Sequence, residues 1–576
     1  MNNICRHGAM GLVFAISSTL WAGEIPGSGG KLDYGTDDLP IPLPIAHNVT
    51  PPRTGTLLAA AAAAEKIPFK KMQLLVELGE SRMVEGVPTL VASLGDENAG
   101  CRANAAVGIA IAGADDTRNE GARKALLADA QLPARLKALG ADPDAHVASA
   151  ALQAQISLQG PTSLAIDAAL KSSVAQVLAV AIEAASQPQQ AKIIVQRFDS
   201  IPVGLRPRAI AALGRSGDTS HAELLIALAN GGDVQQAVAA CQSLATLAIA
   251  DAAPHLRRLT DASHPTLRRE ALRAFGKCAK EGRLELATAR LTDADVTVRQ
   301  AAVEVVGANL TAGAVASIVP HLATDYEPLY RATRTALISA KDDATREMCI
   351  QAAGKLLHDA SPRRQEDGSY VLGMYRSAHE LERQVELLDF SVEKPDWKLI
   401  EQVARSVGQI AQQAPRAAIV KLVNARSELI VAQTNSSPAV NAAIIAGGQM
   451  GATEILPACD RVLAEDPMRS DTNARLAAAF AIGVAGTPSS PGVDRLFNVL
   501  NSPMDAGKIE ALKAIGNLKI PGAADRIQSF PTSESYVLQW LIQWATARIN
   551  GVPAQHPVTM ITWSARSSIS DVERFQ

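Results

Sequence analysis

Aromatic residues are scarce in this 576-residue chain, where Phe, Trp and Tyr together make up only 3%. Charged residues are also few, at 20%, against about a quarter in a typical soluble protein. The 55 basic and 58 acidic residues give a net charge of −3, which supplies no general attraction to nucleic acid or acidic membranes. Hydrophobic residues nevertheless reach 47%, enough for a sizeable core. A large core that is poor in aromatics indicates many small, closely packed helices.

Cysteine provides neither a disulfide framework nor a metal site. One of the six cysteines, Cys5, lies at the extreme N-terminus, and the other five are widely scattered. An odd, scattered set is a poor basis for disulfides. The absence of any Cys-x-x-Cys argues against zinc ribbons, thioredoxin-like redox centres and covalently attached haem. Cys241, Cys278 and Cys349 lie in apolar helical patterns, so we expect them to be buried.

Catalytic signatures are missing as well. The sequence has no Gly-x-Ser-x-Gly, no His-Glu-x-x-His, no phosphate-binding loop and no dinucleotide-binding glycine pattern after a strand. It therefore nominates no catalytic residue, no cofactor and no metal ligand. Whether the chain is an enzyme stays open, with a non-enzymatic role favoured. No stable membrane span is expected, because no later run of about 18 apolar residues lacks charges and helix breakers.

The first 22 residues resemble a targeting segment. Arg6 and His7 precede the apolar stretch Gly8–Leu20, and the small residues Ala22 and Gly23 follow it. This order predicts a signal peptide at 1–22, cleaved near Ala22. An uncleaved anchor is the weaker interpretation, because the stretch is short for a bilayer. We therefore expect an exported, periplasmic or extracellular protein.

Residues 23–55 are rich in glycine and proline. Prolines at positions 40, 42 and 44 forbid a regular helix and favour an extended arm. The arm is either a linker, a strap along the first helices, or a recognition segment.

From residue 56 onward a ten-residue pattern returns. Its first, fifth, sixth and ninth positions are apolar and form one stripe on a helix. Its fifth position is Ala or Val, which lets a neighbouring helix approach closely, and its last is usually Gly, for a close crossing or a helix stop. Four windows start at 205, 234, 267 and 298, at intervals of 29, 33 and 31 residues. The others start at 399, 439, 474 and 507.

A second helical segment lies between these windows, and it often contains an early proline, as at Pro88, Pro254, Pro320 and Pro457. Each repeat is thus predicted to be a bent first helix, a turn and a straighter second helix. Neither helix buries its stripe alone, so the hairpins must stack.

These units resemble HEAT repeats of the armadillo-type superfold, particularly the short phycobilisome-lyase-like class. The segments that carry the resemblance are DVTVRQAAVEVVG (295–307), DTNARLAAAFAIG (471–483) and HPTLRREALRAFG (264–276). The resemblance implies an all-α fold, an α-solenoid of helical hairpins over 56–530. It weakens over 161–200 and near 361–395, where we expect a long loop or a degenerate repeat. The lyase relatives attach bilin chromophores, but no bilin site is marked here.

The second window position is basic in five of the eight windows. We interpret these residues as a structural ladder, in which a helix-start acid satisfies free amides and the basic residue pairs with an acid. They are Arg206, Arg268, Arg299, Arg475 and Lys508.

The most basic neighbourhood is 255–290. It is either a patch for an anionic partner or an ordinary solvated surface, since acids are interspersed. The candidate partner-binding residues there are Arg257, Arg258, Arg268, Arg269 and Arg273.

The C-terminal region, 531–576, concentrates aromatic residues. Tyr536, Trp540 and Trp544 share one helix face at a spacing of four. They either cap the open end of the core or anchor a partner. The function that we expect is an exported scaffold or adaptor that binds a protein partner and not nucleic acid. The alternative is a lyase-like HEAT enzyme or a helper subunit of an exported enzyme.

Overall fold

The structure is a computed structural model that describes residues 55–114, 120–160, 164–426, 429, 437–465, 471–500, 505–530 and 536–552. Across these residues the regular secondary structure is entirely helical, so the predicted all-α class is confirmed. The predicted signal peptide, nearly all of the 23–55 arm and the tail from residue 553 lie outside the described residues. None of the described helices is long and apolar enough to cross a membrane.

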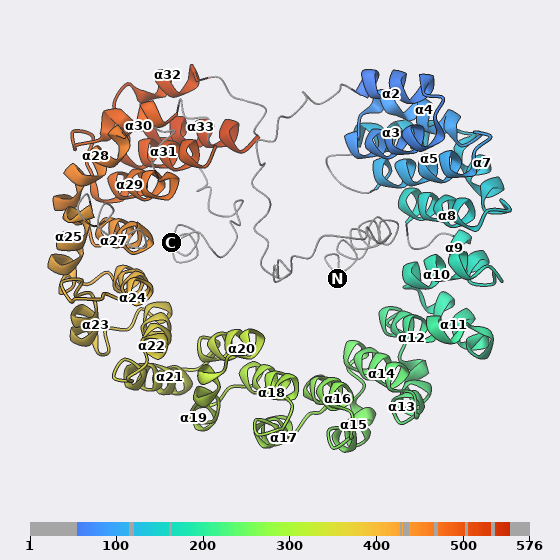
Figure 1. The fold of residues 1–576 in the computed structure, drawn as a ribbon, viewed down its shortest axis with the longest axis horizontal. Helices are drawn as coiled ribbons and strands as arrows, with labels where there is room; N and C mark the ends of the chain where they lie inside the picture. Colours follow the sequence, from blue (N-terminus) through green and yellow to red (C-terminus); the bar gives the residue numbers. More distant parts are fainter. Residues whose placement is uncertain are drawn as a thin grey trace. The chain divides into compact units, whose positions relative to one another are not determined.

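The chain divides into two units, residues 1–286 and 287–576, and each is a series of helical hairpins. Within each unit the second helices of the hairpins form one row and the first helices form another (Figure 1). Second helices of successive hairpins pack against each other, which buries the apolar stripes.

The first unit pairs α2 (Gly55–Ala64) with α3 (Pro68–Ser81), α4 (Val87–Ser93) with α5 (Ala99–Ala112), α7 (Leu132–Leu139) with α8 (Ala145–Gln159), α9 (Leu164–Ala169) with α10 (Ala175–Ala184), α11 (Pro188–Gln196) with α12 (Arg206–Arg215), α13 (Ala222–Ala229) with α14 (Val234–Leu247), and α15 (Ala253–Leu259) with α16 (Pro265–Cys278). Helix α6 (Glu120–Ala128) precedes α7, and α17 (Arg283–Arg290) spans the division between the units.

The second unit begins with α18 (Val296–Ala308) and pairs α19 (Val315–Ile318) with α20 (Glu327–Leu337), α21 (Asp343–Leu356) with α22 (Pro362–Met374), α23 (Leu381–Leu387) with α24 (Trp397–Ile410), α25 (Arg416–Asn424) with α27 (Ser437–Gln449), α28 (Leu456–Ala464) with α29 (Thr472–Ala485), α30 (Val493–Val499) with α31 (Asp505–Leu518), and α32 (Ala523–Gln528) with α33 (Tyr536–Ile549).

Three of the four early prolines lie at the start of a first helix, whereas Pro320 is the second residue of the 3-10 helix Val319–Ala323 that follows α19. Pro88, Pro254 and Pro457 are each the second residue of an α-helix, directly after a 3-10 turn. A missing amide costs nothing there, because the first amides of a helix have no helical partner. The predicted change of direction in the first helix is therefore the junction between the 3-10 turn and the α-helix.

The loop that enters each second helix is fixed by side chains. Asp295 and Asp471 accept hydrogen bonds from the backbone amides two residues later, at 2.8 and 2.9 Å. The predicted helix-start role of these acids is confirmed, because they satisfy amides that the helix leaves free.

The ladder arginines hold the same loop from the other side. Arg268 and Arg299 each donate from Nη1 to two backbone carbonyls, six and five residues earlier, at 2.8–3.0 Å. The predicted structural role is confirmed for these two arginines, and the loop carbonyls are partners that the sequence reasoning did not name. These arginines bind carbonyls of the loop between the two helices, where the chain has left the helical hydrogen-bond pattern.

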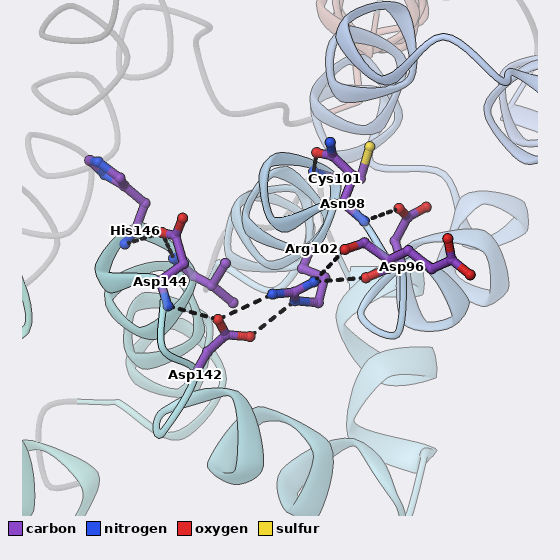
Figure 2. A network of polar contacts seen from close by, with 9 residues as sticks. Asp96, Asn98, Cys101, Arg102, Asp142, Asp144 and His146 are labelled. Carbon is purple, nitrogen blue, oxygen red and sulfur yellow. Dashed lines mark hydrogen bonds and ion pairs between the residues drawn. The ribbon is translucent and has the colours of Figure 1, made fainter.

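One member of this ladder also links two hairpins (Figure 2). Arg102 binds the carbonyl oxygens of Asp96 and Glu97 at 2.9 and 3.0 Å. Its Nε and Nη2 donate to the Asp142 carboxylate, in the entry loop of α8, at 3.0 and 3.2 Å. Sequence comparison did not place Arg102 in the ladder, because its helix was not among the aligned windows.

The glycine that ends the repeat pattern serves close helix crossings. A Cβ added at Gly483, inside α29, would lie 2.6 Å from the Cα of Ala514 on α31, and one at Gly448 would lie 2.9 Å from the Cα of Ala481. No side chain fits there. The alternative role as a helix stop is wrong for these positions, because both glycines lie within helices. Their small partners occupy the eighth window position, a signal that the sequence reasoning missed.

The structure corrects the register of the window that started at 234. In α14, Ala240 and Ser243 are buried as Ala271 and Ala274 are in α16, whereas Val238 is partly exposed. The window therefore starts at 236. The four starts at 205, 236, 267 and 298 are then each 31 residues apart.

The two stretches of weak repeat signal are helical. Residues 362–374 form α22 and residues 381–387 form α23, so the long loop expected near 361–395 is wrong and the degenerate repeat is right. Helices α9, α10 and α11 account for most of 161–200.

All five cysteines in the described residues are free and buried, as predicted for three of them. Burial raises the pKa of the Cys241 and Cys459 thiols to about 12, so these groups stay protonated and unreactive.

Candidate partner-binding surface

A groove of about 660 Å³ crosses three successive second helices of the first unit, α12, α14 and α16. Its lining comes largely from the first two turns of these helices. The lining residues are Pro207, Arg208, Ala211, Val234, Gln235, Val238, Ala239, Gln242, His264 and Thr266.

Helix α14 supplies the apolar middle of the groove. Its sequence, VQQAVAACQSLATL, contains no charged residue. Val234 and Val238 line the groove because the register leaves them partly exposed, while Ala237, Ala240 and Leu244 face the core. Apolar side chains with a few hydrogen-bonding groups are the usual composition of a ligand or partner site.

Basic residues border this apolar strip on two helices: Arg208 of α12 lines the groove, and Arg269 and Arg273 of α16 lie beside it on Glu270, to which Gln242 of the lining donates. Within their bounds, helix α12 has three basic residues, α14 has none and α16 has four, a total of seven, against the acid Glu270; a further acid, Asp233, is the N-cap of α14 beside Val234. Some of them serve the fold: Arg215, for example, donates to the carbonyl oxygen of Ile182 at 2.8 Å. The positive charge available to a partner is therefore smaller than the count of seven basic residues suggests, but these helices still carry more positive than negative charge.

Glu270 is the buried centre of the charged network beside the groove, with only 6% of its surface exposed. Arg269 Nε and Arg273 Nη1 donate to its Oε1 at 2.8 and 3.0 Å, and Gln242 Nε2 donates to Oε2 at 3.3 Å. Burial alone would raise the pKa of Glu270, but the bond from Arg269 and the charge of Arg273 outweigh it and lower the pKa. The carboxylate stays charged and fixes both arginines.

Arg208 is the most accessible cation in the lining. Its side chain is 57% exposed and lies 3.4 Å from the Glu183 carboxylate. Water screens such a pair strongly, so Glu183 holds Arg208 only weakly.

The structure distributes the five arginines proposed from the sequence over different settings. Arg269 and Arg273 lie beside the groove, on Glu270. Arg268 is bound to loop carbonyls. Arg257 and Arg258 lie on the first helix α15, where Arg257 is 3.6 Å from Glu285 and Arg258 is 2.8 Å from His255 Nδ1.

The C-terminal aromatic residues belong to α33. Trp544 is 3% exposed and packs on Gly516 of α31, as a core-covering residue would. The side chains of Trp540 and Tyr536 lie outside the part of the chain that the structure describes.

A second polar cluster, absent from the sequence predictions, joins α20 and α22. Asp367 is fully buried, accepts a hydrogen bond from Tyr330 Oη at 2.6 Å and lies 3.3 Å from Arg334 Nε. The Arg334 guanidinium stacks on the Tyr370 ring at 3.8 Å. One feature of the sequence could have indicated this cluster: four of the six tyrosines lie between positions 326 and 375.

Titratable groups of this cluster are shifted. Burial raises the pKa of Tyr330 to about 12. Burial, with the negative charges of Asp396 and Asp367, raises the pKa of Glu366 to about 7. Asp367 and Tyr330 are buried between helices of the second unit, where Glu366 is half-buried, whereas the groove lies in the first unit.

In the described residues, no group of His, Cys, Asp and Glu side chains is arranged to hold a metal ion.

No family model and no curated protein matches the chain. Solved structures do. A structure of Kap95p with RanGDP matches with a TM-score of 0.52 at 12% identity, over 86% of this chain and 77% of that one. The fold is a HEAT-repeat α-solenoid. A structure of yeast importin-beta (Kap95p) has a TM-score of 0.48 at 14% identity, over 86% and 73% of the two chains. A further importin-beta structure has a TM-score of 0.48 at 13% identity, over 86% and 82%.

The HEAT-repeat solenoid predicted from the sequence is thus confirmed at the level of the fold. Membership of the phycobilisome-lyase-like class stays a prediction.

Proposed function

We propose that this HEAT-repeat solenoid is a scaffold or adaptor that binds another protein through the second-helix surface of its first unit. The observation that carries the proposal is the groove over α12, α14 and α16, which combines an apolar strip with a basic border. The solved structure of Kap95p with RanGDP is a case of this fold bound to a protein.

The position of the shifted titratable groups supports a scaffold over an enzyme. A catalytic site usually combines an accessible cavity with groups of perturbed pKa. Here Asp367 and Tyr330 are buried between helices, Glu366 is half-buried, and none of the three lines the groove. An exported lyase-like enzyme would need these two features in one place.

Affinity purification of the tagged chain, followed by mass spectrometry, tests the proposal. The decisive variant is Val238→Glu, which places a carboxylate in the apolar strip of the groove. Ala227→Glu, at an exposed position on the first helix α13, is the matched control. The proposal predicts a partner that the wild type and Ala227→Glu recover and Val238→Glu loses. Equal recovery with all three proteins, or no specific partner, would contradict it.

We further propose that the protein acts after export, in the periplasm or outside the cell. The support is the order of the first 23 residues, with Arg6 before the apolar stretch and Ala22 after it. N-terminal sequencing should find a mature chain that begins near Gly23 in the exported fraction. An intact Met1 on soluble cytoplasmic protein would end this part of the proposal.

A further inference from the structure

We propose that the groove over α12, α14 and α16 binds an extended acidic segment of the partner protein, in which carboxylates alternate with apolar side chains. This inference rests on the proposed function and adds the chemistry of the partner.

Charge sets the sign of the ligand. Three successive second helices carry seven basic residues and one acidic residue, although the whole chain has a net charge of −3. The local excess is therefore a property of these helices and not of the composition, and three of its members lie at the groove: Arg208 in the lining, with Arg269 and Arg273 beside it. The first turns of the same helices line the groove, and their N-terminal partial charges have the same sign as the arginines.

The buried Glu270 holds two of these arginines in place, ready to bind a carboxylate of the partner. Arg269 and Arg273 are 27% and 34% exposed, and each donates one hydrogen bond to Glu270 Oε1. That bond uses Nε of Arg269, and the two terminal nitrogens of its guanidinium take no part in it. Since Glu270 already restricts both side chains, a carboxylate bound by them costs less conformational entropy than one bound by mobile arginines.

The lining favours a peptide over other anions. Pro207, Ala211, Val234, Val238 and Ala239 provide apolar contacts across three helices, which a free inorganic anion would not use. An extended peptide places successive side chains on opposite sides, so acidic and apolar residues can meet the basic border and the apolar strip in turn.

Nucleic acid fits the lining less well. Proteins that bind single strands combine basic grooves with aromatic side chains on which bases stack. None of the ten lining residues is Phe, Tyr or Trp, and the one imidazole, that of His264, lies at the N-cap of α16, at one end of the groove. An acidic peptide is therefore the favoured occupant.

Fluorescence anisotropy with the full mature chain tests the inference. The probe is a fluorescein-labelled dodecapeptide in which aspartate alternates with leucine, valine and proline. The comparison probe has asparagine in place of every aspartate. We expect saturable binding of the acidic probe, at least tenfold weaker binding of the asparagine probe, and weakening of the acidic probe by added salt.

Two variants assign the site. Arg269→Gln with Arg273→Gln should weaken the acidic probe at least tenfold. Because this pair leaves Glu270 buried without its cations, Arg208→Gln provides a second measurement that leaves the Glu270 network in place, and it should weaken the probe two- to fivefold. The control is Arg331→Gln, a 49% exposed arginine of α20 that pairs with Glu327 in the second unit. It should change nothing.

Three results would overturn the inference. They are equal affinity for the acidic and asparagine probes, unchanged affinity in both groove variants, and tighter binding of a twelve-nucleotide single-stranded DNA than of the peptide. Deletion of residues 23–54 distinguishes another occupant. If it strengthens probe binding more than threefold, the groove belongs to the chain's own arm, which contains Asp33, Asp37 and Asp38.

The scaffold proposal and the acidic-segment inference can be contradicted by different results. A partner lost by Val238→Glu but retained by Arg208→Gln and by the Arg269 and Arg273 double variant would leave the scaffold role in place. That result would contradict only the inference that the bound segment is acidic.

Discussion

Replacing Trp544 by alanine should destabilise the C-terminal end of the second unit. The indole is 3% exposed and packs where α33 crosses α31, so closely that a Cβ at Gly516 would lie 2.5 Å from Cζ3. Loss of a fully buried tryptophan leaves a cavity that neighbouring side chains cannot fill. We expect a cost of roughly 3–5 kcal/mol in the free energy of unfolding.

The loss should be local. In a repeat protein each hairpin contacts only its neighbours, so the terminal hairpins can open without the rest. Opening of α31 and α33 should become about 10²- to 4 × 10³-fold more frequent, because each 1.4 kcal/mol is a factor of ten. Hydrogen exchange should show this increase over residues 505–549, while exchange in α24 and α27 stays near the wild-type rate.

The matched control is Gln543→Ala, an exposed neighbour on the same helix. It should stay within about 0.5 kcal/mol of the wild type. Deletion of residues 531–576 should expose the core and promote self-association. If Trp544→Ala exchanges like Gln543→Ala, the capping role is refuted. If it also loses a captured partner, Trp544 is a docking residue instead.

Three further perturbations test the packing of the repeat. Ala302→Leu should cost roughly 1–3 kcal/mol, because Ala302 is fully buried between helices, and an unchanged melting midpoint would refute the proposed register. A double-mutant cycle of Arg102→Ala and Asp142→Ala should give a coupling energy of about 1–2 kcal/mol by chemical denaturation, and a value near zero would refute the link between hairpins. Glu366→Gln should flatten the pH dependence of stability. The folded wild type holds a proton on Glu366 up to about pH 7, so it should lose stability as the pH rises from about 4.5 to 7, and equal slopes in both proteins would refute this.

Much of the fold was readable from the sequence because each repeat carries the same small residues. Ala271 and Ala302 were placed between helices from their window positions, and both are fully buried. The register failed in α14 for a physical reason. Its run of alanines, with Cys241 and Ser243, offers small buried residues in two registers, and hydrophobic period alone cannot separate them.

The candidate site was only partly readable. Arg269 and Arg273 were named from the density of basic residues. The same density also named Arg268, which instead donates to backbone carbonyls of the loop five and six residues before it. The difference depends on Glu270, which is buried and accepts a hydrogen bond from Gln242 of the preceding hairpin at 3.3 Å. Contacts between hairpins of this kind leave no periodic signal.

The weak repeat signal near 361–395 has its origin in a polar helix boundary. Several other second helices cross where a glycine meets a small residue, as at Gly448 and Gly483. Between α20 and α22, in contrast, the Tyr375 hydroxyl donates to the Leu337 carbonyl at 2.8 Å and accepts from the Ala340 amide at 3.3 Å. Asp367 is satisfied on one oxygen by Tyr330, while its other oxygen has no hydrogen-bond partner among the described residues. Burial raises the pKa of Asp367, which adds to the effect of Glu366. Because buried polar groups stabilise a boundary only when they are bonded, the stability of this crossing depends on protonation, and the small-residue crossings do not share that dependence.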